Sequence, residues 1–234
     1  MNKQFIFTGL ILILSIFGCE KTEYTLNSEN GPKVSNVIWF DYMESTILVA
    51  DSVSYIDIPI SLNKLADDAF KNVIFSTDLG VFANGSNSII IETNSYRNGI
   101  ATLYAGDKEG VAHIRAMVDS ISIDTSLRFI KALPDYMLFS PGVILTEKEN
   151  VKVDLTLKRE VGKVGEDIIV QIQYKSLDTV VGILDVQSSI MVQSGNDSVT
   201  VSNPFNLKGR FEVVAKSQNQ ELDSISVSTI IVFK

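Results

Sequence analysis

The chain is poor in the side chains on which many enzymes and metalloproteins rely. Its 234 residues include one cysteine, one histidine and one tryptophan. A single cysteine cannot form a disulfide within the chain, and it cannot build a zinc site from several thiolates. These shortages exclude an intramolecular disulfide framework and a cysteine-based structural zinc site.

Basic side chains are also in the minority. The chain has 20 Lys and Arg against 28 Asp and Glu, and its formal net charge is −8. No run of Lys and Arg interrupts this balance. A polyphosphate surface requires clustered cations, so we do not expect nucleic acid to be a partner.

The N-terminus carries the most hydrophobic segment. Lys3 is followed by uncharged residues through Gly18, and residues 5–17 are almost entirely apolar. At 1.5 Å per residue this segment spans about 20 Å, less than the roughly 30 Å of a bilayer core. Residues 1–18 are therefore predicted to be a secretion signal peptide and not a membrane span.

The end of this signal contains the only cysteine. The junction Ile16, Phe17, Gly18 and Cys19 resembles the lipobox of bacterial lipoproteins. That resemblance implies a mature N-terminus at Cys19 that carries acyl chains, including palmitate, and thus a membrane as partner. At about 0.8 kcal/mol per buried CH₂, two or three chains would hold the protein permanently on a membrane. The alternative is an ordinary cleavable signal with an incidental cysteine.

Residues 19–33 join this cysteine to the rest of the chain. They are polar, end near Gly31 and Pro32, and show no apolar periodicity. We interpret them as a flexible tether with a root-mean-square span of about 20 Å. The expected location is the cell envelope, most simply the outer membrane, and the sequence leaves open whether the protein faces the periplasm or the surface.

From Val34 onward the sequence alternates with the period of β-strands. Residues 56, 58, 60 and 62 are apolar and are separated by Asp57, Pro59 and Ser61. No segment keeps a 3.6-residue period over three turns, although residues 62–71 could hold one short helical turn. An all-β fold is predicted.

Two halves of the chain share this pattern. Residues 55–77 and 151–174 each contain an alternating strand, a polar connection and a second apolar strand. Similar landmarks recur about 100 residues apart, which is the size of one immunoglobulin-like sandwich. We predict two tandem immunoglobulin-like β-sandwiches, 34–134 and 135–234; the alternative is a single large sandwich.

Three motifs of the first half carry a more specific resemblance. Residues 73–82, 98–104 and 110–116 are similar to the bacterial immunoglobulin-like domains of the invasin and intimin type. The second half keeps Gly209 and Ala215 but has no clear counterpart of residues 76–82. The resemblance implies stalk or spacer domains that project a binding tip, with no catalytic constellation.

The residues themselves point to no catalytic site either. His113 alternates out of phase with its apolar neighbours and should face solvent. The acidic pairs Asp67-Asp68 and Glu166-Asp167 fall in predicted connections between strands. No calcium-loop motif is present. We predict that the protein is not an enzyme and has neither cofactor nor metal.

Binding of a glycan is a separate hypothesis. Sugar-binding surfaces use aromatic platforms, and the candidates are Trp39, Tyr42, Tyr96 and Tyr104. Alternation predicts that Tyr96 and Tyr104 are exposed. Trp39 is expected to pack in the core as part of the first strand.

A repeated triplet provides candidate modification sites. Asp followed by Ser or Thr and then Val or Ile occurs five times, and resembles a bacterial O-glycosylation acceptor. The candidate residues are Ser52, Ser120, Thr179, Ser198 and Ser224. Strands that begin with Asp and alternate Ser with Val would produce the same triplet.

Two strands carry expectations about their neighbours. Residues 88–92, Ser-Ile-Ile-Ile-Glu, are so prone to β-pairing that they are expected either to be paired inside a sheet or to recruit other chains. Pro59 cannot donate a ladder hydrogen bond, so its strand is expected to be an edge or to contain a bulge.

Two functional hypotheses follow. The first is a lipid-anchored envelope protein whose tandem domains act as a non-enzymatic spacer, adhesin-like module or assembly subunit. The alternative is a glycan-binding surface lipoprotein of a nutrient uptake system. The ligand, protein or glycan, is not identified by the sequence.

Overall fold

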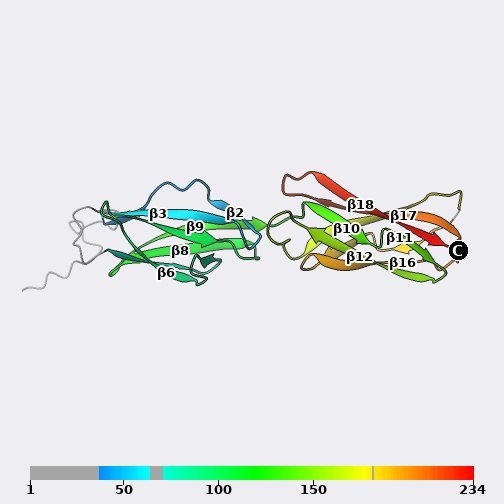
Figure 1. Ribbon diagram of the computed structural model, residues 1–234, viewed down its shortest axis with the longest axis horizontal. Coiled ribbons are helices and arrows are strands. Elements are labelled where there is room, and N and C mark those ends of the chain that lie inside the picture. The colour runs from blue at the N-terminus through cyan, green and yellow to red at the C-terminus, as the bar shows by residue number, and fades with distance from the viewer. Residues whose placement is uncertain (1–36, 64–70, 181) are drawn as a thin grey trace, which may run out of the picture.

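The computed structural model describes residues 37–63, 71–180 and 182–234. These residues form two β-sandwiches placed end to end as a rod, with the C-terminus at the end of the second sandwich that lies away from the first (Figure 1). The fold is all-β, as predicted. Among the described residues no helix is long and apolar enough to cross a membrane.

The first sandwich is made of two sheets. Its strands are β1 (Ile38–Phe40), β2 (Ile47–Ala50), β3 (Tyr55–Leu62), β4 (Asn72–Thr77), β5 (Val81–Phe82), β6 (Ser88–Glu92), β7 (Asn98–Tyr104), β8 (Gly110–Val118) and β9 (Ile121–Lys131). One sheet has the order β1-β3-β7-β5 and the other β2-β9-β8-β4-β6. The β2–β9 pair is parallel, and the other described pairs are antiparallel.

The second sandwich repeats this topology strand for strand. Its strands are β10 (Tyr136–Ser140), β11 (Val143–Thr146), β12 (Asn150–Lys158), β13 (Ile168–Ser176), β14 (Asp185–Val186), β15 (Ser189–Val192), β16 (Asn196–Ser202), β17 (Gly209–Gln218) and β18 (Ser224–Phe233). The sheet orders are β10-β12-β16-β14 and β11-β18-β17-β13-β15, and β11 pairs with β18 in parallel. The internal similarity of the sequence therefore reflects two copies of one fold.

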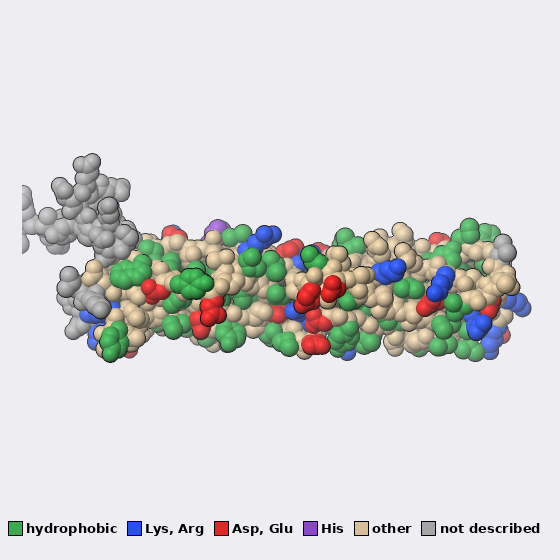
Figure 2. All heavy atoms as spheres, turned by 90° about the horizontal axis from the view of Figure 1, so that it is seen from above, with side chains coloured by type: hydrophobic (Ala, Val, Ile, Leu, Met, Phe, Trp, Pro, Cys, Tyr) green, Lys and Arg blue, Asp and Glu red, His purple; other side chains and the backbone are tan. Residues whose placement is uncertain are grey.

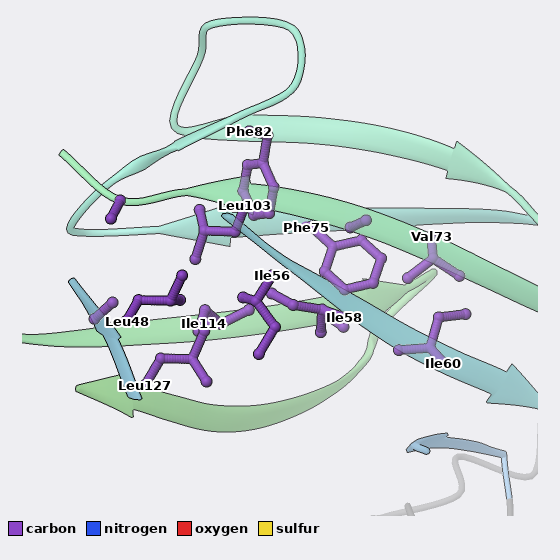
Figure 3. Close-up of a cluster of buried hydrophobic side chains, with 14 of the residues drawn as sticks. Leu48, Ile56, Ile58, Ile60, Val73, Phe75, Phe82, Leu103, Ile114 and Leu127 are labelled. Atoms are coloured by element: carbon purple, nitrogen blue, oxygen red, sulfur yellow. The ribbon is translucent and has the colours of Figure 1, made fainter. Parts of the chain in front are cut away.

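Each sandwich has its own hydrophobic core. In the first, Ile56, Ile58 and Ile60 of β3 point toward Phe75 of β4 in the facing sheet (Figure 3). The equivalent core of the second is built around side chains such as Phe211 of β17. Burying one face of each sheet explains the period of two, because successive side chains of a strand point to opposite faces.

The turn after β4 has a counterpart in the second copy that the sequence does not reveal. Thr77 donates its hydroxyl to the carbonyl oxygen of Leu79 at 2.7 Å, and Ser176, at the end of β13, donates to that of Asp178 at 2.7 Å. Gly80 follows the first turn at φ +80, and a Cβ there would lie 2.6 Å from the Tyr104 carbonyl oxygen. A glycine is required at this position.

The first alternative for residues 88–92, a position inside a sheet, is wrong. β6, Ser88–Glu92, is an edge strand that, among the described strands, pairs only with β4. The expectation for Pro59 is met in a restricted sense. β3 lies between β1 and β7, and β1 pairs with residues 60–62. One residue further on, the Asp41 amide still donates to the Pro59 carbonyl oxygen at 3.0 Å. Pro59 has no N–H with which to return that bond, so the pairing of β3 with the β1 side ends at Pro59.

One contact between the two sandwiches is made by a loop from each. Residues 51–54, between β2 and β3, contact residues 159–167, between β12 and β13. The Lys163 amide donates to the Asp51 carbonyl oxygen at 2.8 Å. Gly162 has φ +80, and a Cβ there would lie 2.6 Å from the same oxygen. The two loops are therefore in contact through their backbones, with no room for a side chain at Gly162.

A buried ion pair lies in this joint. Arg159 Nη2 is 3.6 Å from Asp51 Oδ2, and the two side chains are only 10% and 4% exposed. The Asp51 carboxylate also accepts hydrogen bonds from the amides of Val53 and Ser54, at 3.0 and 2.7 Å. A buried charge is stable only when it is paired and hydrogen-bonded, so this pair favours the relative position of the domains that is observed.

The segment that links the domains is held as well. The Leu133 carbonyl accepts a hydrogen bond from Arg159 Nη1 at 2.6 Å. The Leu133 amide donates to the side-chain oxygen of Gln220 at 3.1 Å. The Gly165 amide donates to the Ala132 carbonyl at 2.8 Å. The linker is thus hydrogen-bonded to two loops of the second sandwich, and these bonds oppose bending between the domains.

Candidate functional site

The candidate ligand surface is the outer face of the four-stranded sheet of the first sandwich. After β1 the chain leaves this sheet at Asp41 and joins the opposite sheet at Ile47. The crossing leaves a shallow hollow of about 490 Å³ beside β3. Tyr42, Tyr55 and Pro59 line it together with Ile100 of β7.

Aromatic rings gather at the end of this face nearest the second domain. Tyr55 and Tyr104 are register partners in β3 and β7, and their ring centroids are 5.4 Å apart at an interplanar angle of 42°. Val81 of β5 lies opposite Tyr104 on its other side. Tyr42, across the hollow, is 85% exposed. Three tyrosines therefore present ring surface on one side of one sheet.

A carboxylate lies in the middle of the same face. Thr102 donates its hydroxyl to Asp57 at 2.6 Å across the β3–β7 ladder. Glu44 and Ser45 line the hollow as well, and no Lys, Arg or His from the described part of the chain does. The surface thus offers aromatic rings with hydrogen-bond acceptors beside them, a combination suited to a ligand that has apolar faces and hydroxyl groups.

The structure brings together only part of the predicted aromatic set. Tyr42 and Tyr104 lie on this face. Tyr96 is 73% exposed but belongs to the β6–β7 loop, at the opposite end of β7 from Tyr104. The length of β7 separates them, a distance of about 20 Å. Tyr96 and Tyr104 cannot contact the same small ligand.

The expectation for Trp39 is wrong. Ile38 is the β1 residue that enters the core, so Trp39 points outward and is 38% exposed. Its indole N–H donates to Asp41 at 3.1 Å. A short edge strand buries only one of two adjacent apolar residues, and the run Val-Ile-Trp-Phe does not say which.

Sequence reasoning misses Tyr55 as a site residue, although the sequence contains a signal for it. The inward residues Ile56, Ile58 and Ile60 place Tyr55 and Asp57 on the outer face. The pairing of Tyr55 with Tyr104 depends on the register of two strands that are far apart in sequence, and the alternation pattern carries no information about that register.

The remaining candidates are exposed wherever the structure describes them. His113 is exposed, and its amide donates to Asp78 at 2.7 Å. Glu166 and Asp167 are exposed in the β12–β13 loop. No group of metal-ligating side chains is found within 37–63, 71–180 and 182–234. The pair Asp67-Asp68 lies outside the described residues.

The predicted modification sites are distributed over both domains. Ser120, Thr179 and Ser224 are exposed, whereas Ser52 and Ser198 are half-buried. Ser52 lies in the loop that forms the joint, where its amide donates to the Gly106 carbonyl at 3.2 Å. O-glycosylation stays a prediction for all five. The predicted signal peptide, Cys19 and the predicted tether through Lys33 lie outside the described residues.

Charge is arranged unevenly along the rod. Figure 2 shows acidic side chains gathered near the middle, where the two domains meet, and apolar side chains scattered over both halves. Asp107 and Glu109 of the first domain and Glu166 and Asp167 of the second line a small recess there. Lys131 reaches Glu109 at 3.5 Å and partly balances this charge.

Comparison with known proteins gives a fold likeness. No protein-family model matches the chain, and no curated protein matches its sequence. The Yersinia pseudotuberculosis adhesin InvE aligns with a TM-score of 0.52 at 14% identity, over 86% of this chain and 59% of that one. Invasin, a bacterial integrin-binding protein, aligns with a TM-score of 0.53 at 15% identity, over 85% of this chain and 40% of that one.

These alignments cover both sandwiches of this chain and only part of the two adhesins. Identities of 14% and 15% carry information about the fold and none about a particular ligand. The chain therefore has the tandem immunoglobulin-like architecture that is found in adhesins of the invasin type.

Proposed function

We propose that the protein is a lipid-anchored envelope protein whose two domains form a stiff, non-enzymatic spacer or adhesin-like module. The observation that supports this most strongly is the joint. A buried Asp51–Arg159 pair, loop-to-loop backbone contact and a bonded linker favour one relative position of the two domains. A stiff rod keeps its far end away from the point of attachment, whereas a hinged pair of domains would not.

The anchor in this proposal is Cys19, followed by the tether 19–33. Protease shaving of intact cells would distinguish a surface location from a periplasmic one. The protein in this proposal meets its partner through a protein or glycan contact and carries out no chemistry. The aligned adhesins support this, since invasin is itself described as binding integrin.

The anchor is tested by labelling cells with an alkynyl palmitate analogue. We expect label on the wild-type chain and none on the Cys19→Ser variant, which should also be released from membranes. Label on neither chain would contradict the lipid anchor. The spacer is tested separately by small-angle X-ray scattering, where a maximum dimension well below that of the extended rod would contradict it.

A second candidate function is glycan binding at the tyrosine face. The adjacent rings of Tyr55 and Tyr104, the exposed Tyr42 and the Asp57 carboxylate support it. On a glycan array we expect Tyr104→Ala and Tyr55→Ala to lose binding, by about tenfold for 1–2 kcal/mol of stacking. Tyr96→Ala is the matched control, because it removes an exposed tyrosine from the other end of the domain. Absence of any binding by the wild type would contradict this candidate.

A further inference from the structure

The outer edge of β6 pairs with no other described strand. The Thr77 amide donates to the Asn87 carbonyl at 2.9 Å, and the Thr93 amide to the Lys71 carbonyl at 2.9 Å. Alternate residues of an antiparallel strand bond to the same neighbour. Residues 87, 89, 91 and 93 therefore face β4, and the amides and carbonyls of residues 88, 90 and 92 face away from it.

Little protects this edge. Among the described strands none pairs with β6 on its outer side. One of its outward carbonyls, that of Ser88, accepts a hydrogen bond from the Asn84 side chain at 2.9 Å. Ile90, at the centre of the strand, is 63% exposed. The strand contains neither Lys nor Pro, the residues with which sheet edges are commonly blocked, and its only charge is Glu92 at the end.

The strand is complementary to a second copy of itself. If two β6 strands pair antiparallel about Ile90, Ile90 meets Ile90 of the other copy and Ser88 meets Glu92. These are the residues whose backbone groups point outward, so the pairing matches the hydrogen-bond pattern of both edges. The Ser88 carbonyl, which already accepts from the Asn84 side chain, would accept a second hydrogen bond from Glu92 of the other copy. A shift by one residue would oppose groups that already bond to β4.

Side chains agree with the same register. Ile90 pairs with Ile74 within the sheet, and Ile74 pairs with Met117 of β8 on its other side. Joining two copies at Ile90 would continue this apolar row from one sheet into the next and cover the exposed Ile90. Each Glu92 would face a serine, and the two Glu92 carboxylates would be about 13 Å apart along the strand, beyond a Debye length at physiological salt.

We propose that the protein forms a two-fold symmetric dimer in which the β6 edges of two copies pair antiparallel, centred on Ile90. The contact is isologous, so it closes on itself and does not produce a filament. A five-residue edge is smaller than a standard interface, so the dimer is expected to be weak in dilute solution and to form where the chain is concentrated. The proposal depends on the folded part and not on the proposed lipid anchor.

The test is a disulfide cross-link at the two-fold axis. In the full chain, Ile90→Cys places two thiols on directly opposed residues, about 5.5 Å apart at Cα, which a disulfide can span. Under mild oxidation we expect a cross-linked dimer. The matched control is Ile169→Cys in β13, because Ile169 is also 63% exposed but lies in a strand flanked by β15 and β17. We expect at least about tenfold less dimer from this variant.

A second measurement does not depend on introduced thiols. In analytical ultracentrifugation of the purified full chain in nonionic detergent, we expect association at high concentration that Ile90→Lys abolishes and Ile169→Lys leaves unchanged. Wild type that stays monomeric, equal cross-linking of both cysteine variants, or cross-linking of Ile90→Cys only to a different protein would each overturn the proposal. The last outcome would assign the edge to a strand supplied by another protein.

Discussion

Arg159 of the second domain lies 3.6 Å from the Asp51 carboxylate of the first, and both side chains are almost fully buried. We expect Arg159→Met to weaken the joint by about 2 kcal/mol, because the Asp51 charge keeps its amide donors but loses its cation. Small-angle scattering should then report a broader range of shapes and a smaller average dimension. Arg115→Met is the control, since the Arg115–Asp124 pair, at 2.8 Å, is more than half exposed and is expected to contribute little.

Gly162 is expected to tolerate no side chain. Gly162→Ala would bring a Cβ to within 2.6 Å of the Asp51 carbonyl oxygen, and it would add the cost of a positive φ, about 1–2 kcal/mol. We expect the domains to separate at this contact, which scattering would detect. Gly85→Ala separates the two effects, because Gly85 has φ +75 and no atom lies within 4 Å of the place its new methyl group would occupy. A joint that opens equally in both variants would contradict the steric argument.

The two cores are expected to respond independently to cavities. Phe75 and Phe211 are fully buried, one in each domain. Phe75→Ala should destabilise the first domain and Phe211→Ala the second, each by about 3–5 kcal/mol. Hydrogen exchange read out by mass spectrometry would show faster exchange in the altered domain. Equal loss of protection in both domains would indicate that they unfold as one unit.

Two surface ion pairs should make the free energy of unfolding of the second domain fall at acidic pH. Hydrogen bonds from Arg210 hold the pKa of Asp178 below its ordinary value, and a hydrogen bond from Lys175 does the same for the pKa of Glu212. A lowered folded-state pKa means that the stabilisation is present above the ordinary carboxyl pKa and is lost as the pH falls through the lowered value. Urea unfolding at neutral pH and at a pH below both carboxyl pKa values should show this loss.

The variant Asp178→Asn is expected to reduce that pH dependence in the second domain. The first domain, followed in the same experiment by hydrogen exchange, is the internal control because Asp178 makes no contribution to its core. An unchanged difference between neutral and acidic pH in the second domain would show that the Arg210 pair does not contribute.

How much the sequence can predict depends on whether a feature is local. Alternation along β3 is local, and it correctly indicates a strand with one buried face. The order of strands in a sheet is not local. The run Ser-Ile-Ile-Ile-Glu resembles an interior strand, yet it lies at an edge because the described chain places β4, and no further strand, beside it. Its pairing tendency can be recognised, but its neighbours cannot.

The joint lies beyond sequence reasoning for the same reason. Asp51 and Arg159 are in different domains, and no sequence motif connects them. The triplet that begins at Asp51 resembles a modification signal, whereas its carboxylate caps the amides of Val53 and Ser54 and meets Arg159. The hollow beside β3 similarly depends on where the chain crosses between sheets, which the pattern around Asp41 does not specify.

The β2–β3 loop of the first domain and the β11–β12 loop of the second occupy the same place in the repeated topology. Only the β2–β3 loop is part of the joint. Residues 51–54 cannot change in length without changing the angle between the domains. Their counterpart in the second domain, residues 147–149 between β11 and β12, lies at the far end of the rod, and no described residue of the first domain bonds to its backbone. Insertions and grafted peptides should therefore be accepted there, so an engineer could add a new binding sequence to that loop without disturbing the joint.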